Sequence, residues 1–145
     1  MNDVDILKKI EKKVLWLACW MIHNANHIRE NQDGLKVGGH QASSASIVSI
    51  MTALYFSILR PEDRVAVKPH ASPVFHAIQY LSGLQTKEKI QNFRGFGGAQ
   101  SYPSRTKDID DVDISTGSVG LGVAMTSFIS LIQDYVARKK FYKNK

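Results

Sequence analysis

Residues 63–73 read DRVAVKPHASP, and this stretch decides which fold class the sequence predicts. Residues 64–68 form a short run that is rich in valine, which is typical of a β-strand. Pro69, His70 and Ser72 follow this run directly. Because ligands bind at the carboxyl ends of strands in open α/β sheets, we expect His70 to lie at a binding site.

Helical periodicity surrounds this predicted strand on both sides. Apolar residues at helical spacing predict helices over 4–29, 43–58, 74–81, 86–93 and 118–140, with an ordered loop over 95–113. In the last of these helices, the residues expected to pack inward are Val123, Phe128, Leu131, Ile132 and Val136. This alternation predicts an α/β fold, but one strand cannot make a sheet. We therefore expect an incomplete piece of a larger fold, or a chain that borrows strands from a partner.

Length, charge and cysteine content narrow the functional classes. The 145 residues suffice for one domain, and five positive charges of the net +6 fall in the tail after residue 137. A terminal basic cluster of this kind is typically a solvated end, so we expect no nucleic-acid partner. Cys19 is the single cysteine, which excludes an intrachain disulfide and favours a cytoplasmic location. The sequence contains no apolar run of about 18 residues, so we expect no membrane partner.

Two histidines and one glycine-rich turn are candidates for binding chemistry. His40 follows Gly38-Gly39 and His70 follows Pro69, and both precede small residues that leave room for a ligand. Imidazole can bind a phosphate or transfer a proton, although either residue alone can be an ordinary loop histidine. Residues 115–122 form a glycine-rich start to a helix, where backbone amides favour an anion. Tight helix packing through Gly120 and Gly122 explains the same glycines equally well.

Two other clusters resemble metal sites without meeting the requirements. Cys19, His23 and His27 share one helix face, but the first and third lie about 12 Å apart by helical rise, too far for one ion. The acidic residues of 108–113 lack the glycine and the final glutamate of a calcium loop. We interpret this segment as a solvated or salt-bridged loop and expect no metal site within the chain.

The order and spacing of these motifs resemble a known enzyme family. The matching segments are Gly38-Gly39-His40-Gln41-Ala42-Ser43-Ser44, residues 63–73, Asn92-Phe93-Arg94, Ser101-Tyr102-Pro103 and residues 115–122. In this order they resemble the N-terminal, diphosphate-binding domain of transketolases. The Gly-Gly-His-x-Ala-Ser-Ser and Ser-Tyr-Pro forms are closer to the homodimeric decarboxylating component of pyruvate dehydrogenase.

The resemblance implies a cofactor and roles for four residues. The family uses thiamine diphosphate, and the matching positions make His40 and His70 catalytic residues beside the cofactor and the reacting substrate. Gly117 and Val119 would also line the cofactor. Two departures leave the substrate open: Pro69 replaces the usual glycine, and Ser104 stands where the family has another active-site histidine.

The resemblance also implies what this chain does not contain. Family members bind Mg²⁺ through a later Gly-Asp motif, and they carry a pyrimidine-binding domain and a C-terminal domain. We therefore expect residues 1–145 to form a truncated, helix-rich part of a doubly wound parallel-sheet fold. On this view the chain belongs to an enzyme of 2-oxo acid decarboxylation or ketol transfer, a homodimer in its full-length form. We expect weak cofactor binding and no turnover without a complementing chain, or alternatively a non-catalytic protein-interaction remnant.

Overall fold

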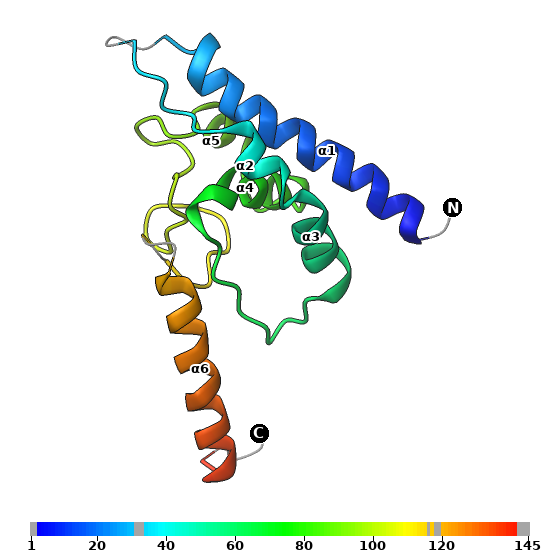
Figure 1. Ribbon diagram of the computed structural model, residues 1–145, viewed down its shortest axis with the longest axis vertical. Coiled ribbons are helices and arrows are strands. Elements are labelled where there is room, and N and C mark those ends of the chain that lie inside the picture. The colour runs from blue at the N-terminus through cyan, green and yellow to red at the C-terminus, as the bar shows by residue number, and fades with distance from the viewer. Residues whose placement is uncertain (1–2, 31–33, 116, 118–119, 142–145) are drawn as a thin grey trace.

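The computed structural model describes residues 3–30, 34–115, 117 and 120–141, and its regular elements are helices (Figure 1). Helices form within each range predicted from periodicity, although residues 43–58 divide among three elements of which the first begins at Gln41, and residues 118 and 119 lie outside the described residues. In chain order the elements are α1 (Asp3–His23), the π-helical η1 (Asn24–Ile28), α2 (Gln41–Ala45), α3 (Val48–Ala53), the π-helical η2 (Leu54–Ile58), the 3₁₀ helix η3 (Pro69–Ala71), α4 (Ser72–Leu81), α5 (Lys87–Gln91) and α6 (Leu121–Arg138).

The core forms where α1 lies against α2, α3 and α4 (Figure 1). Val14, Ala18 and Met21 fall on one face of α1 and are completely buried. They meet Phe75 and Ile78 of α4, which are also buried. Burying a side chain of this size stabilises the fold by about 1.5–3 kcal/mol, so these contacts fix the position of α4.

Local sequence explains where the helices that flank the site begin. Pro73 lies in the first turn of α4, where its missing N–H costs no hydrogen bond. The Thr86 side chain caps α5 by accepting a hydrogen bond from the Lys89 backbone N–H at 3.3 Å. Because η3 leads directly into α4, the buried helix also positions His70.

The predicted α/β fold with a doubly wound parallel sheet is wrong: no described residue lies in a β-strand. Residues 63–68 have no regular secondary structure, although Lys68 is extended, and no second described segment pairs with them. The Val65 backbone N–H instead donates to Asp113 Oδ2 at 2.9 Å. A strand exists only when a neighbour completes its hydrogen-bond ladder, and this part of the chain supplies none.

The predicted inward packing of the last helix is also wrong. None of the α6 side chains is buried, and Figure 1 shows the helix projecting from the rest of the molecule. The side chains of Phe128, Leu131 and Ile132 are each more than 60% exposed, Val123 is exposed and Val136 is partly buried. No helix among the described residues combines the length and the apolar character that spanning a bilayer requires.

Candidate functional site

A small cavity forms where four separate segments of the chain meet. Its volume is about 250 Å³, and it lies between the end of α1, the turn before α2, the η3–α4 junction and the turn that follows α5. The lining residues are Ile22, Gly38, Gly39, His40, Ser43, Ser44, His70, Pro73 and Arg94. The structure therefore brings the two predicted histidines, His40 and His70, to one cavity, with both side chains exposed at its edge.

The turn that carries His40 is held by a side chain that the sequence did not point to. Asn26 accepts a hydrogen bond from the Gly38 backbone N–H at 2.6 Å and donates one to the Gly39 carbonyl oxygen at 3.0 Å. Gly39 has a φ of +84°, a conformation that glycine adopts without strain. A Cβ on Gly38 would lie 2.5 Å from the Ile22 carbonyl oxygen. Both glycines are therefore needed for the turn that presents His40.

A second contact joins the segments that carry the two histidines. Ser44 on α2 is buried, and its hydroxyl donates to the backbone carbonyl oxygen of His70 at 3.1 Å. Small residues at this position let α2 approach the start of α4 closely. The Ser44 contact therefore fixes the separation of the two imidazole-bearing segments across the cavity.

Arg94 adds a cation to the cavity; the matching motifs include this residue, but the sequence assigned it no role. Its Nη1 donates to the Val37 carbonyl oxygen at 2.7 Å, and its guanidinium carbon lies 5.3 Å from the centre of the Phe93 ring. Burial lowers the pKa of Arg94, and the Tyr102 phenol acts in the opposite direction. Because arginine remains protonated in proteins, the cavity keeps a permanent positive charge. None of the described residues that line it is acidic.

No protein-family model matches the chain. It is 30% identical to the pyruvate dehydrogenase E1 component of Mycobacterium tuberculosis over 132 residues, which cover 83% of this chain and 14% of the relative. The E1 component of Pseudomonas aeruginosa is 29% identical over 97% of this chain and 16% of its own length. That of Escherichia coli K12 is 27% identical, over 83% of this chain and 14% of its own length.

The chain is homologous to part of the pyruvate dehydrogenase E1 component. The resemblance that the sequence motifs indicate is thereby confirmed. The chain spans about one seventh of the length of the E1 components that it matches.

The described residues of the glycine-rich turn, which the resemblance to the E1 component places at the cofactor, do not line this cavity. Gly117 is exposed and is not among the lining residues, and Val119 lies outside the described residues. A Cβ on Gly117 or Gly120 would have no atom within 4 Å. Close packing therefore does not require a glycine at position 120. The alternative explanation of this turn, tight helix packing through Gly120 and Gly122, is removed for Gly120.

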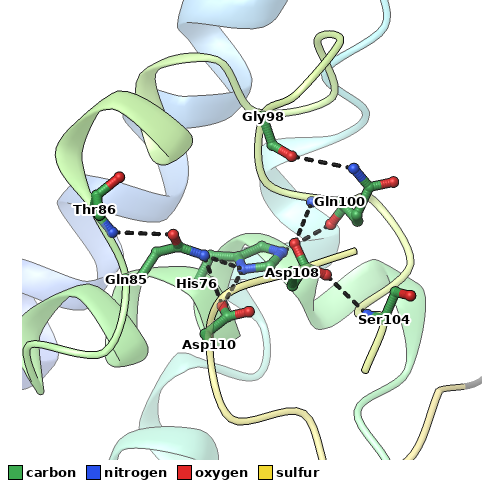
Figure 2. A network of polar contacts seen from close by, with 8 residues as sticks. All are labelled: His76, Gln85, Thr86, Gly98, Gln100, Ser104, Asp108 and Asp110. Carbon is green, nitrogen blue, oxygen red and sulfur yellow. Dashed lines mark hydrogen bonds and ion pairs between the residues drawn. The ribbon is translucent and has the colours of Figure 1, made fainter. Parts of the chain in front are cut away.

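Asp108 and Asp110 of the acidic loop take part in a largely buried network of hydrogen bonds around His76 of α4 (Figure 2). His76 Nδ1 lies 2.6 Å from Asp110 Oδ2, and Nε2 lies 2.8 Å from the Gln100 carbonyl oxygen. Because a carbonyl oxygen only accepts, Nε2 carries a proton, and a further proton lies between Nδ1 and Asp110. Gln85 donates to the same Asp110 oxygen at 2.9 Å. The salt-bridged interpretation of the loop therefore holds for Asp110.

The contacts of His76 with Asp110 and with the Gln100 carbonyl oxygen join the long loop to α4, the helix that positions His70. Asp108 accepts hydrogen bonds from the backbone N–H groups of Gln100 at 2.9 Å and Ser104 at 2.8 Å (Figure 2).

His76, Asp108 and Asp110 form the one group in the described residues close enough for a shared cation. Two ligands of a tetrahedral ion with bonds of about 2 Å lie about 3.3 Å apart, so the 2.6 Å contact of Asp110 is that of a charge-assisted hydrogen bond. The network is accordingly a structural anchor.

Proposed function

We propose that this chain supplies the diphosphate-holding part of a thiamine-diphosphate enzyme of the pyruvate dehydrogenase or transketolase type. The reaction is decarboxylation of a 2-oxo acid or transfer of a ketol group, and it requires a complementing chain that carries the remaining domains. One observation supports this above all: His40 and His70 line the same cavity with Arg94, and no acidic residue of the described part lines it. The homology to the E1 component supplies the reaction class.

The residues of the cavity fit a diphosphate but do not fit its metal ion. Two imidazoles, a guanidinium and the Ser43 hydroxyl offer donors and positive charge to phosphate oxygens. Magnesium requires oxygen ligands such as carboxylates, which the described lining residues do not supply. We therefore propose that Mg²⁺ binds with residues of the complementing chain.

The roles that we propose for the cofactor and for this chain follow from these groups. Thiamine diphosphate, when bound, supplies the carbanion chemistry that cleaves the bond beside a carbonyl. The role of this chain is to hold the diphosphate and to place the two imidazoles where they can accept and return protons. Gly117 and Val119 remain proposed cofactor contacts of the assembled enzyme. We place this enzyme in the cytoplasm, supported by the single cysteine, and propose a homodimer for its complete form.

Coexpression tests the proposal. The chain is coexpressed with a polypeptide carrying the Gly-Asp motif and the later domains of an E1 component, and thiamine diphosphate binding and pyruvate decarboxylation are measured. We expect tight cofactor binding and turnover in the assembly, and weak cofactor binding without turnover in the 145-residue chain alone. His40→Ala and His70→Ala should each lower the rate at least about 10²-fold, the usual size of an acid–base contribution.

His27→Ala provides the matched control, because His27 is an exposed imidazole on η1 that does not line the cavity. This variant should keep the activity of the unmodified assembly. Turnover by the chain alone, or equal losses in all three variants, would argue against the proposal.

The exposed apolar side chains of α6 favour a second candidate function. In this alternative the chain is a non-catalytic module that docks another protein through α6. The same coexpression separates the two functions. An assembly that forms stably but binds no thiamine diphosphate supports the docking module.

A further inference from the structure

The guanidinium of Arg94 is held in the cavity wall with much of its hydrogen-bonding capacity unused. A guanidinium has five N–H donors. Within the described part of the chain, the guanidinium donates one hydrogen bond, from Nη1 to the Val37 carbonyl oxygen. The Nε atom is buried and has no partner there, and neither ion pair found among the described residues involves Arg94. Leaving a buried charged donor unsatisfied costs free energy that some other interaction must offset.

The backbone at Arg94 is also in an uncommon conformation. Its φ of +61° lies in the left-handed region, which L-residues other than asparagine and aspartate rarely adopt. The backbone N–H of Arg94 donates to the Ala99 carbonyl oxygen at 2.9 Å, which closes the short turn around residues 94–99. Strained conformations of this kind persist where surrounding structure holds a side chain in place, and they concentrate at functional sites.

The guanidinium lies against the turn that presents His40. A Cβ on Gly39 would be 3.2 Å from Arg94 Nη1 and 3.4 Å from Nη2, so the side chain packs directly on the glycine backbone. His70 reaches the same cavity from its other wall. A charged, planar donor group and two imidazoles therefore face one volume of about 250 Å³, with no acidic side chain of the described residues among them.

We propose that Arg94 is an oxyanion-binding residue of this cavity. Its free N–H groups receive two oxygens of one anion, either the terminal phosphate of a diphosphate or the carboxylate of a 2-oxo acid. Arginine binds both groups through paired parallel hydrogen bonds, and this geometry distinguishes it from lysine. The proposal deepens the function proposed above and rests on it for the identity of the two anions.

Calorimetric titration of the full 145-residue chain tests this role with two probes, inorganic pyrophosphate and pyruvate. The probe that binds the unmodified chain identifies the source of the oxyanion. Arg94→Gln should weaken that binding about 10-fold to 100-fold, the value of one charge-assisted hydrogen-bond pair. Arg94→Lys keeps the charge without the paired geometry and should give an intermediate loss.

Arg105→Gln is the matched control, because it removes one positive charge from an exposed residue that does not line this cavity. Equal weakening by Arg94→Gln and Arg105→Gln would overturn the proposal, as would the absence of binding by either probe. If circular dichroism shows that Arg94→Gln does not fold, the test rests on Arg94→Lys. Full affinity of Arg94→Lys for the probe would overturn the proposed paired hydrogen bonds. In the coexpressed assembly, cofactor binding could depend on the two histidines and be unchanged in Arg94→Gln. That result would support the proposed function and show that Arg94 does not bind the anion.

Discussion

Asp110 is the residue on which the anchoring of the long loop depends. Its Oδ2 meets His76 and Gln85, and its Oδ1 is buried with no partner in the described part of the chain. Asp110→Asn removes the charge that faces the buried imidazole, and breaking a buried pair in this way is strongly destabilising. We expect the free energy of unfolding, measured by urea denaturation, to fall by about 3 kcal/mol.

The neighbouring acid provides the comparison for this prediction. Asp111 is exposed, so Asp111→Asn should change the free energy of unfolding by less than about 0.5 kcal/mol. If the two variants lose equal stability, the contact between His76 and Asp110 does not anchor the loop.

Gly38 is a second residue whose replacement has a defined steric consequence. A Cβ there would lie 2.5 Å from the Ile22 carbonyl oxygen and 2.9 Å from Asn26 Oδ1. Gly38→Ala should therefore destabilise the chain by about 1–3 kcal/mol, the usual cost of overpacking, measured by thermal unfolding. Gly120→Ala should be neutral or slightly stabilising, because a Cβ there meets no atom within 4 Å. A neutral Gly38→Ala would show that the turn before His40 is not held as described.

The site could be predicted from the sequence only in part, and individual residues show why. Turn chemistry before His40 and His70 marked both positions, because glycine and proline report local backbone geometry directly. Asn26 stands in no such pattern, and Arg94 belongs to a matching motif, Asn92-Phe93-Arg94, that by itself indicates no role. Their importance depends on contacts with Val37, Gly38 and Gly39, which lie far from Arg94 in the sequence and become neighbours only after folding.

At the scale of elements, the helices were predictable and the sheet was not. Apolar spacing gives the ranges of α1, α4 and α6, because helical periodicity is a property of a single segment. A strand depends on a partner segment that local sequence does not reveal. Residues 64–68 therefore have the composition of a strand but no regular secondary structure, and the Val65 backbone N–H donates its hydrogen bond to an aspartate side chain.

The same reasoning explains why the packing of α6 was predicted wrongly. Its apolar residues do fall on a helical stripe, as Phe128 and Ile132 at i and i+4 illustrate, but the described residues contain no surface that covers them. Periodicity indicates that a face is suited to burial and does not identify the surface that buries it. The correct conclusion from the stripe is that α6 needs a partner.

For the molecule as a whole, this uncovered helix predicts association. Leu121, Met125, Phe128, Ile132 and Tyr135 all follow one side of α6, and all are exposed. A contiguous apolar surface on a soluble domain promotes self-association or binding to another protein. We expect the purified chain to show a concentration-dependent increase in sedimentation coefficient by analytical ultracentrifugation.

The double variant Phe128→Glu with Ile132→Glu should suppress this association, because charged side chains on the stripe oppose burial of a second surface. Its free energy of unfolding should stay within about 0.5 kcal/mol of the unmodified chain, since neither side chain packs on the core. Phe93→Ala, at a fully buried core residue, should instead cost about 3–5 kcal/mol. A large loss of stability in the double variant would mean that α6 packs inward after all, as its sequence pattern alone predicts.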